Sequence, residues 1–88
     1  MIKANQIRAA RGFASLDQKK LAELAGLSVA SLRRMESDKI GPERSNAGAV
    51  ENVKRTLEAH GITFLESGGT ATGPGVSYTP NSDSQIKP

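Results

Sequence analysis

The sequence predicts a mainly α protein of one domain, a bundle of four short helices followed by a short C-terminal β-hairpin. Two observations carry this prediction. Apolar residues recur at spacings of three and four through most of the first 60 positions, which is the period of a helix buried on one side. After residue 61 the pattern changes to short β-branched and aromatic runs around a glycine-rich segment, which is typical of paired strands. A chain of 88 residues is long enough for one small core.

Composition excludes several classes of protein. The chain has no cysteine, so disulfides and zinc–thiolate sites are excluded. No apolar run approaches the ~18 residues that span a bilayer, and the N-terminus lacks the apolar stretch of a signal peptide, so a cytoplasmic protein without membrane contact is expected. Residues 1–55 hold eleven of the twelve Lys and Arg and six acidic residues, a net charge of +5, whereas residues 56–88 have a net charge of −2. The basic part favours a polyanionic partner, although a merely solvated surface can show the same bias.

The first helix is expected over residues 1–11, with Gly12 ending it. Its start is open between two alternatives. Either Asn5 caps the helix, or the helix begins nearer Lys3. Arg8 is expected to point outward, away from the core.

Residues 17–36 predict two short helices joined by a tight turn, and the rest of the chain is organised around them. Gly26 falls where the first of the two must end, because a residue just past a helix commonly takes a positive φ. Asp17 and Ser28 stand directly before the two helices, where a side-chain oxygen caps a free backbone N–H. Helices of about eight residues are not stable alone, so each must bury its apolar stripe against its neighbours.

The outer face of the second helix lacks large hydrophobic side chains. Small residues come first and arginines follow, and no carboxylate precedes Glu36. The side chains on this face are Val29, Ala30, Ser31, Arg33 and Arg34. Such a helix can approach another surface closely.

This segment resembles the helix-turn-helix of Cro and the phage repressors, the Xre family, at nearly every characteristic position. The matching residues are Gln18, Leu21, Ala22, Ala25, Gly26, Leu27, Ser28, Leu32, Met35 and Glu36. An ordinary helical hairpin in a small bundle is the alternative. The resemblance covers residues 1–60, and the ending looks like a short subgroup of Xre regulators that has a strand pair in place of a fifth helix. It implies a repressor-like bundle that places helix 28–36 in the major groove of double-stranded DNA.

The resemblance also implies a function and a set of site residues. The function is sequence-specific DNA binding by a transcriptional regulator, expected to be a repressor. Base contacts are expected from Val29, Ala30, Arg33 and Arg34. Phosphate contacts are expected from Gln18, Ser28, Ser31, Ser37, Lys39 and Arg44. In this family an arginine and a glutamate placed like Arg11 and Glu36 form a structural ion pair, and two independent solvated charges are the alternative.

The C-terminal third is expected to hold one more helix and the hairpin. Ser45 or Asn46 caps a helix over residues 47–60, which Gly61 ends. Residues 62–65 and 76–79 then predict two strands, with an irregular tail as the alternative. The expected division is therefore a DNA-binding domain over residues 1–61, a hairpin extension over 62–79 and a disordered tail over 80–88.

Two further classes of function compete with DNA binding. The bundle can serve as a protein-interaction module, such as an antitoxin-like or anti-repressor partner. An enzyme is disfavoured, because His60 stands alone at a helix end and no enclosed pair of carboxylates is evident. No cofactor, metal or small-molecule substrate is expected. A homodimer through residues 62–79 is expected, and a hairpin folded as a lid on its own bundle is the alternative.

Overall fold

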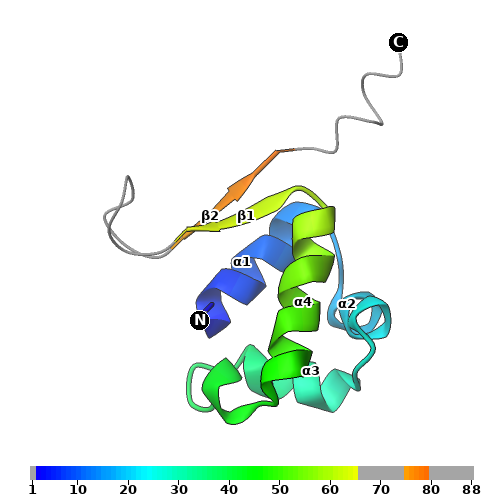
Figure 1. The fold of residues 1–88 in the computed structure, drawn as a ribbon, viewed down its shortest axis with the longest axis vertical. Coiled ribbons are helices and arrows are strands. Elements are labelled where there is room, and N and C mark those ends of the chain that lie inside the picture. The colour runs from blue at the N-terminus through cyan, green and yellow to red at the C-terminus, as the bar shows by residue number, and fades with distance from the viewer. Residues whose placement is uncertain (1, 66–74, 80–88) are drawn as a thin grey trace.

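The computed structural model describes residues 2–65 and 75–79, which form four α-helices and a C-terminal pair of strands (Figure 1). In chain order the elements are α1 (Ala4–Ala14), α2 (Gln18–Ala25), α3 (Val29–Met35), the 3-10 turn η1 (Pro42–Arg44), α4 (Ala47–Ala59), β1 (Ile62–Leu65) and β2 (Gly75–Tyr78). The predicted fold class is confirmed. The expected disorder of residues 80–88 lies outside the described residues. None of the described helices is both long and apolar enough to cross a membrane.

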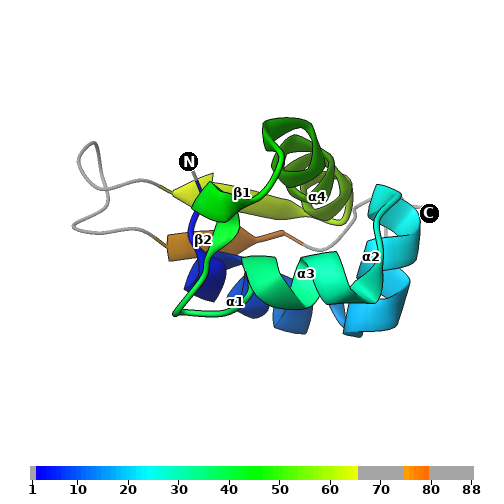
Figure 2. The same ribbon diagram turned by 90° about the horizontal axis from the view of Figure 1, so that it is seen from below.

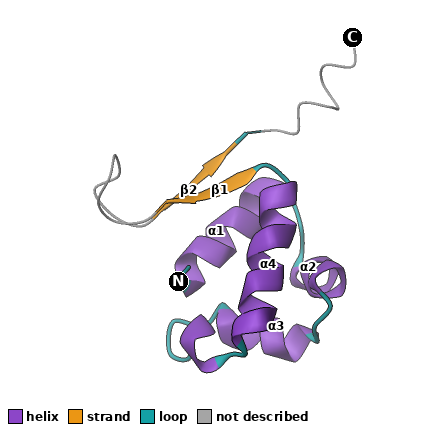
Figure 3. Ribbon diagram, in the orientation of Figure 1, coloured by secondary structure: helices purple, strands orange, loops and turns teal. Residues whose placement is uncertain are grey.

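The core lies where the four helices meet beneath the strands (Figure 3). Its centre consists of side chains with no exposed surface: Ile7, Ala10, Leu21, Leu32, Met35, Val53 and Leu57. Burying one large aliphatic side chain of this kind contributes about 1.5–3 kcal/mol. Ile62 of β1 belongs to the same core. The hairpin therefore packs on the bundle and shares its hydrophobic interior.

Helix α1 ends later than predicted. Gly12 lies inside the helix, which continues to Ala14, and Ser15 takes the left-handed conformation with a φ of 58°. The prediction that Gly12 ends the helix was wrong. The extra turn is stabilised by tertiary contacts, because the ring of Phe13 stacks on that of Tyr78 at 5.8 Å between centroids. Such contacts outweigh the roughly 1 kcal/mol that glycine costs in a helix interior.

The start of α1 is fixed by Gln6, which is 4% exposed. Lys3 is the N-cap residue, and Asn5 lies within the first turn, so the second of the two predicted starts is the observed one. The Gln6 side-chain oxygen accepts a hydrogen bond from the Lys3 N–H at 2.7 Å. Its Nε2 donates to the carbonyl oxygens of Leu65 at 2.9 Å and Gly75 at 2.8 Å. One buried amide thus joins α1 to both strands of the hairpin.

The two strands pair in antiparallel register, which confirms the predicted hairpin. The partners are Ile62 with Tyr78, Thr63 with Ser77, Phe64 with Val76, and Leu65 with Gly75. Because opposed residues share a face, the sheet has an apolar and a polar side. Ile62 is buried, and Phe64 and Val76 pack against the core, whereas Thr63 and Ser77 are exposed. The apolar side packs along α1 and against α4.

Gly61 makes the turn from α4 into β1 possible. Its φ of 95° lies in the left-handed region that favours glycine. A Cβ atom at this position would also collide with the carbonyl oxygen of Thr79. The Thr79 N–H donates to the Gly61 carbonyl at 2.8 Å, so these two segments of the chain need this close approach.

Helix α4 is capped by Asn46, one of the two predicted candidates. Its side-chain oxygen accepts hydrogen bonds from the N–H groups of Gly48 at 2.7 Å and Ala49 at 3.2 Å. On the exposed side of the helix, Glu51 and Arg55 form an ion pair at 3.1 Å.

Candidate nucleic-acid interface

Helices α2 and α3 are joined by the turn that the sequence predicts. Gly26 has a φ of 78°, and its N–H donates to the Glu23 carbonyl at 3.2 Å. The next N–H, that of Leu27, donates to the Ala22 carbonyl at 2.9 Å. Both N–H groups that follow α2 therefore bond to carbonyls in its last turn. Ala22 is only 1% exposed, and a small side chain here lets the two helices cross closely.

Caps fix the starts of both helices. The Asp17 carboxylate accepts a hydrogen bond from the Lys20 N–H at 2.7 Å. The Ser28 hydroxyl oxygen accepts one from the Ser31 N–H at 3.1 Å. Both predicted caps are therefore confirmed, and loss of such a cap typically costs about 1 kcal/mol.

The outward face of α3 is polar and carries two arginines. Ala30, Arg33 and Arg34 are exposed, whereas Ser31 is half-buried. Val29 is also half-buried and packs against the core, so less of its side chain is available than the sequence suggested. Helix α3 lies at the end of the bundle opposite the hairpin (Figure 1), and it is turned toward the viewer when the molecule is seen from below (Figure 2).

Hydrogen bonds along this face order its serines. The hydroxyls of Ser28 and Ser31 lie 3.1 Å apart, and Arg34 donates to the Ser31 oxygen at 3.3 Å. Ser28 and Ser31 thus already have partners within the chain. Arg34 retains further guanidinium donors, since the side chain has five N–H groups.

The far end of α3 is fixed by the ion pair between Arg11 and Glu36. The Arg11 Nε donates to Glu36 Oε2 at 2.8 Å, and a terminal nitrogen donates to Oε1 at 3.1 Å. This bidentate geometry fixes orientation as well as distance. Glu36 is 5% exposed, so the pair is largely removed from water.

Gln18 completes this network, a role that the sequence did not suggest. Its Nε2 donates to Glu36 Oε1 at 2.9 Å. The amide that was expected to reach a DNA phosphate is therefore turned toward a buried carboxylate. A side-chain contact of Gln18 to phosphate would have to use its second amide hydrogen.

Arg8 adds a second clamp between α1 and the end of α3. Its guanidinium donates to the two carboxylate oxygens of Asp38 at 3.0 and 3.3 Å and to the Glu36 carbonyl. Arg8 lies outside the core, as expected, with 39% of its side chain exposed, but the sequence did not suggest that it has partners. The available signal was spacing, because Arg8 lies three residues before Arg11 and so shares its helix face.

The loop after α3 is shaped by a serine turn. The Ser37 hydroxyl accepts hydrogen bonds from the N–H groups of Lys39 at 3.1 Å and Ile40 at 3.4 Å. Lys39 and Arg44 are both exposed. Two exposed cations therefore lie between the end of α3 and the start of α4, one in the loop and one in η1.

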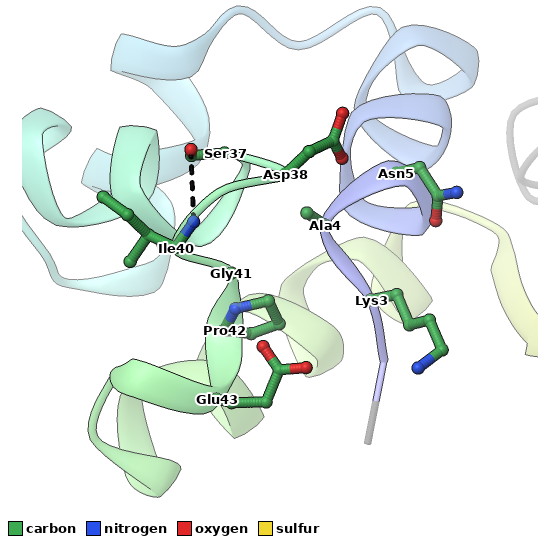
Figure 4. A pocket seen from close by; sticks show the side chains of 9 residues that line it. All are labelled: Lys3, Ala4, Asn5, Ser37, Asp38, Ile40, Gly41, Pro42 and Glu43. Atoms are coloured by element: carbon green, nitrogen blue, oxygen red, sulfur yellow. Dashed lines mark hydrogen bonds between the residues drawn. The ribbon is translucent and has the colours of Figure 1, made fainter.

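Between this loop and the start of α1 lies a cavity of about 180 Å³ (Figure 4). Lys3, Asp38 and Glu43 bring charges of both signs to its wall. Asp38 is already paired with Arg8. Among residues 2–65 and 75–79, no group of three or more His, Cys, Asp or Glu could hold a metal ion.

No model of a known protein family matches this sequence, and no curated protein matches it. Any functional assignment therefore rests on the residues and on the geometry around α3.

Proposed function

We propose that this chain is a sequence-specific DNA-binding transcriptional regulator of the Cro and phage-repressor type, the Xre family, acting as a cytoplasmic repressor. One observation carries the proposal: a polar, arginine-bearing helix face is exposed while both ends of its helix are held rigidly. The cap at Ser28 fixes the start of α3, and the buried Arg11–Glu36 pair fixes its end. A recognition element needs such preorganisation, because base contacts require side chains held in a defined geometry.

Base reading is assigned to the exposed face of α3. Arg34 is the first choice for a bidentate contact to guanine, with Arg33 beside it. Ala30 is exposed and small, so it suits a thymine methyl group. Val29 is half-buried against the core, so only the exposed part of its side chain can contact a thymine methyl group.

Phosphate contacts are assigned to the two ends of this surface. Lys39 and Arg44 supply cations beside α3. The N–H groups of Gln18 and Lys19 in the first turn of α2 lack intrahelical acceptors and suit a phosphate, whereas that of Lys20 is bound by Asp17. Ser28, Ser31 and Ser37 contribute mainly by ordering the backbone that presents these donors.

The second candidate is a protein-interaction module, and one observation favours it. Phe13 is 53% exposed and Tyr78 is 38% exposed, and the two rings stack at the hairpin end of the molecule. Exposed aromatic side chains are enriched at protein interfaces. This surface lies away from α3, so a partner here leaves DNA binding open.

Binding of the full chain to genomic fragments over a series of salt concentrations tests the proposal. We expect a subset of fragments to bind at least about a thousandfold more tightly than random DNA. The logarithm of affinity should fall with the logarithm of salt concentration, at about 0.9 per phosphate contacted. Equal affinity for all fragments would contradict sequence-specific binding, and no binding at low salt would favour the interaction module.

A further inference from the structure

The loop after α3 holds an acidic residue beside its proposed phosphate contact. Asp38 directly precedes Lys39, and both residues are exposed. Neighbouring Cα atoms are about 3.8 Å apart, so the Lys39 ammonium is within reach of an Asp38 carboxylate that has no other partner. An ion pair between the two would cancel the charge that Lys39 offers to a phosphate. The proposed contact therefore requires that the Asp38 side chain be held elsewhere.

Helix α1 holds Asp38 away from Lys39. Arg8 donates to both carboxylate oxygens through its two terminal nitrogens, at 3.0 and 3.3 Å, and this fixes the direction of the carboxylate. The Asp38 side chain is accordingly turned toward α1 (Figure 4). Among residues 2–65 and 75–79, no second ion-pair partner of Asp38 is present. Within this part of the chain, Arg8 therefore sets where the carboxylate points.

The turn that presents Lys39 does not depend on Arg8. The Ser37 hydroxyl accepts hydrogen bonds from the N–H groups of Lys39 and Ile40, so the backbone of the turn is held from within the loop. Arg8 additionally donates to the carbonyl of Glu36, the C-cap residue of α3, where a cation is favoured. Removing Arg8 should thus release the Asp38 carboxylate while the turn persists.

The Arg8–Asp38 pair differs from the structural pair at the same end of the molecule. The Glu36 side chain is 3% exposed in its pair with Arg11. In the other pair, the Arg8 side chain is 39% exposed and that of Asp38 is 74% exposed. Exposed ion pairs contribute little to stability. The effect of Arg8 should therefore appear mainly in binding and only weakly in unfolding.

We propose that Arg8 is a positioning residue for the phosphate contact of Lys39: it holds Asp38 against α1 and so leaves the Lys39 ammonium unpaired. Arg8 acts through Asp38 and does not itself touch DNA. The inference rests on the proposed function, and it adds a residue of α1, a helix outside the proposed DNA-contacting surface. No base takes part in this contact, so the effect is the same on every DNA sequence.

Binding of each variant to a random-sequence duplex over a series of salt concentrations tests the inference. Arg8→Met should weaken binding roughly five- to tenfold at about 0.1 M salt and reduce the salt slope by about 0.9, the value of one lost phosphate contact. Combining Arg8→Met with Asp38→Asn should restore the wild-type slope, because the competing carboxylate is gone. Combining it with Lys39→Ala should lower the slope no further than Lys39→Ala does by itself. A loss of stability alone would not produce this pattern of slopes.

The ion pair between Glu51 and Arg55 is the matched control. It is also exposed, with a separation of 3.1 Å, and it belongs to α4, which runs from the α3 end toward the hairpin (Figure 1). Arg55→Met should leave the slope at the wild-type value, with or without Glu51→Gln. Urea denaturation checks that each variant is folded. Arg8→Gln, which keeps an amide donor on α1, should reproduce the change in slope if Arg8→Met does not fold.

Two results would overturn the inference while the proposed function stands. The first is a wild-type slope for Arg8→Met, which would mean that Asp38 does not compete for Lys39. The second is an equal loss in the Asp38→Asn background, which would mean that Arg8 contacts a phosphate itself. Absence of binding by wild type at low salt would instead overturn the proposed function, and the inference with it.

Discussion

The two ends of this molecule are held by different physical interactions. At the α3 end, charged and amide groups form the contacts, with Arg11 and Gln18 meeting the buried Glu36. At the hairpin end, apolar packing of the sheet is combined with the neutral amide of Gln6. The first arrangement fixes the direction of a helix whose outer face stays polar. The second covers a core and leaves a strand edge open.

Helix α1 takes part in both ends. Its first turns carry Gln6, which bonds to the hairpin, and Arg8, which bonds to Asp38 and the Glu36 carbonyl. Its last turn carries Arg11. Substituting Arg11 should therefore affect the position of α3, and substituting Gln6 should affect the hairpin, although both residues belong to the same helix.

The largest effect is expected for Arg11→Met. The substitution leaves the Glu36 carboxylate buried with only the Gln18 amide as a side-chain donor. Breaking one side of a buried pair should lower the free energy of unfolding by about 3 kcal/mol, measured by urea denaturation. Arg55→Met is the control, because its pair with Glu51 is exposed and worth no more than about 0.5 kcal/mol.

A double variant sharpens this prediction. Arg11→Met combined with Glu36→Leu removes both charges, so most of the lost stability should return. A single variant as stable as the control would mean that Arg11 and Glu36 are effectively independent solvated charges.

The next effect is expected for Gln6→Leu at the other end. The substitution leaves the Lys3 N–H and the carbonyls of Leu65 and Gly75 without their side-chain partner. We expect a loss of about 1–3 kcal/mol, together with faster amide exchange in β1 and β2 than in α3. Asn52→Ala, an exposed change on α4, should leave exchange in the strands unaltered. Equal acceleration in α3 would argue against a role confined to the hairpin.

The difference between the two ends also explains what the sequence could predict. Caps at Asp17 and Ser28 and the turn at Gly26 depend on neighbours within five residues, so local rules identify them. The Arg11–Glu36 pair was predictable only through the family resemblance. Gln6 escaped prediction because its carbonyl partners lie 59 and 69 residues away.

The same reasoning applies to the errors at α1 and in the candidate site. The sequence predicts a helix end at Gly12 because the low helix propensity of glycine is a local property, whereas the stacking of Phe13 on Tyr78 joins residues far apart in the chain. Gln18 was assigned to phosphate because the first turn of a helix attracts anions. Its bond to Glu36 depends on how α2 and α3 meet, which sequence spacing does not specify.

A smaller and more specific effect is expected for Arg34→Ala. Arg34 is exposed, so stability should hardly change, but one or two base positions should lose about 1–3 kcal/mol of discrimination. Competition binding with operator variants measures this loss. Arg55→Ala serves as the control, because it removes the same charge from α4. Uniform weakening on all sequences would reassign Arg34 to a phosphate.

The smallest effect is expected for Lys39→Ala, because a single exposed cation contributes little beyond counterion release. Its backbone N–H is held by the Ser37 hydroxyl, so the side chain leaves from an ordered turn directly after α3. Removing it should weaken specific and random DNA by the same factor and reduce the salt slope by about 0.9. Lys54→Ala, on α4, should leave that slope unchanged. A loss confined to the preferred sequence would mean that Lys39 takes part in reading bases, and the interface would then extend beyond α3 into the loop.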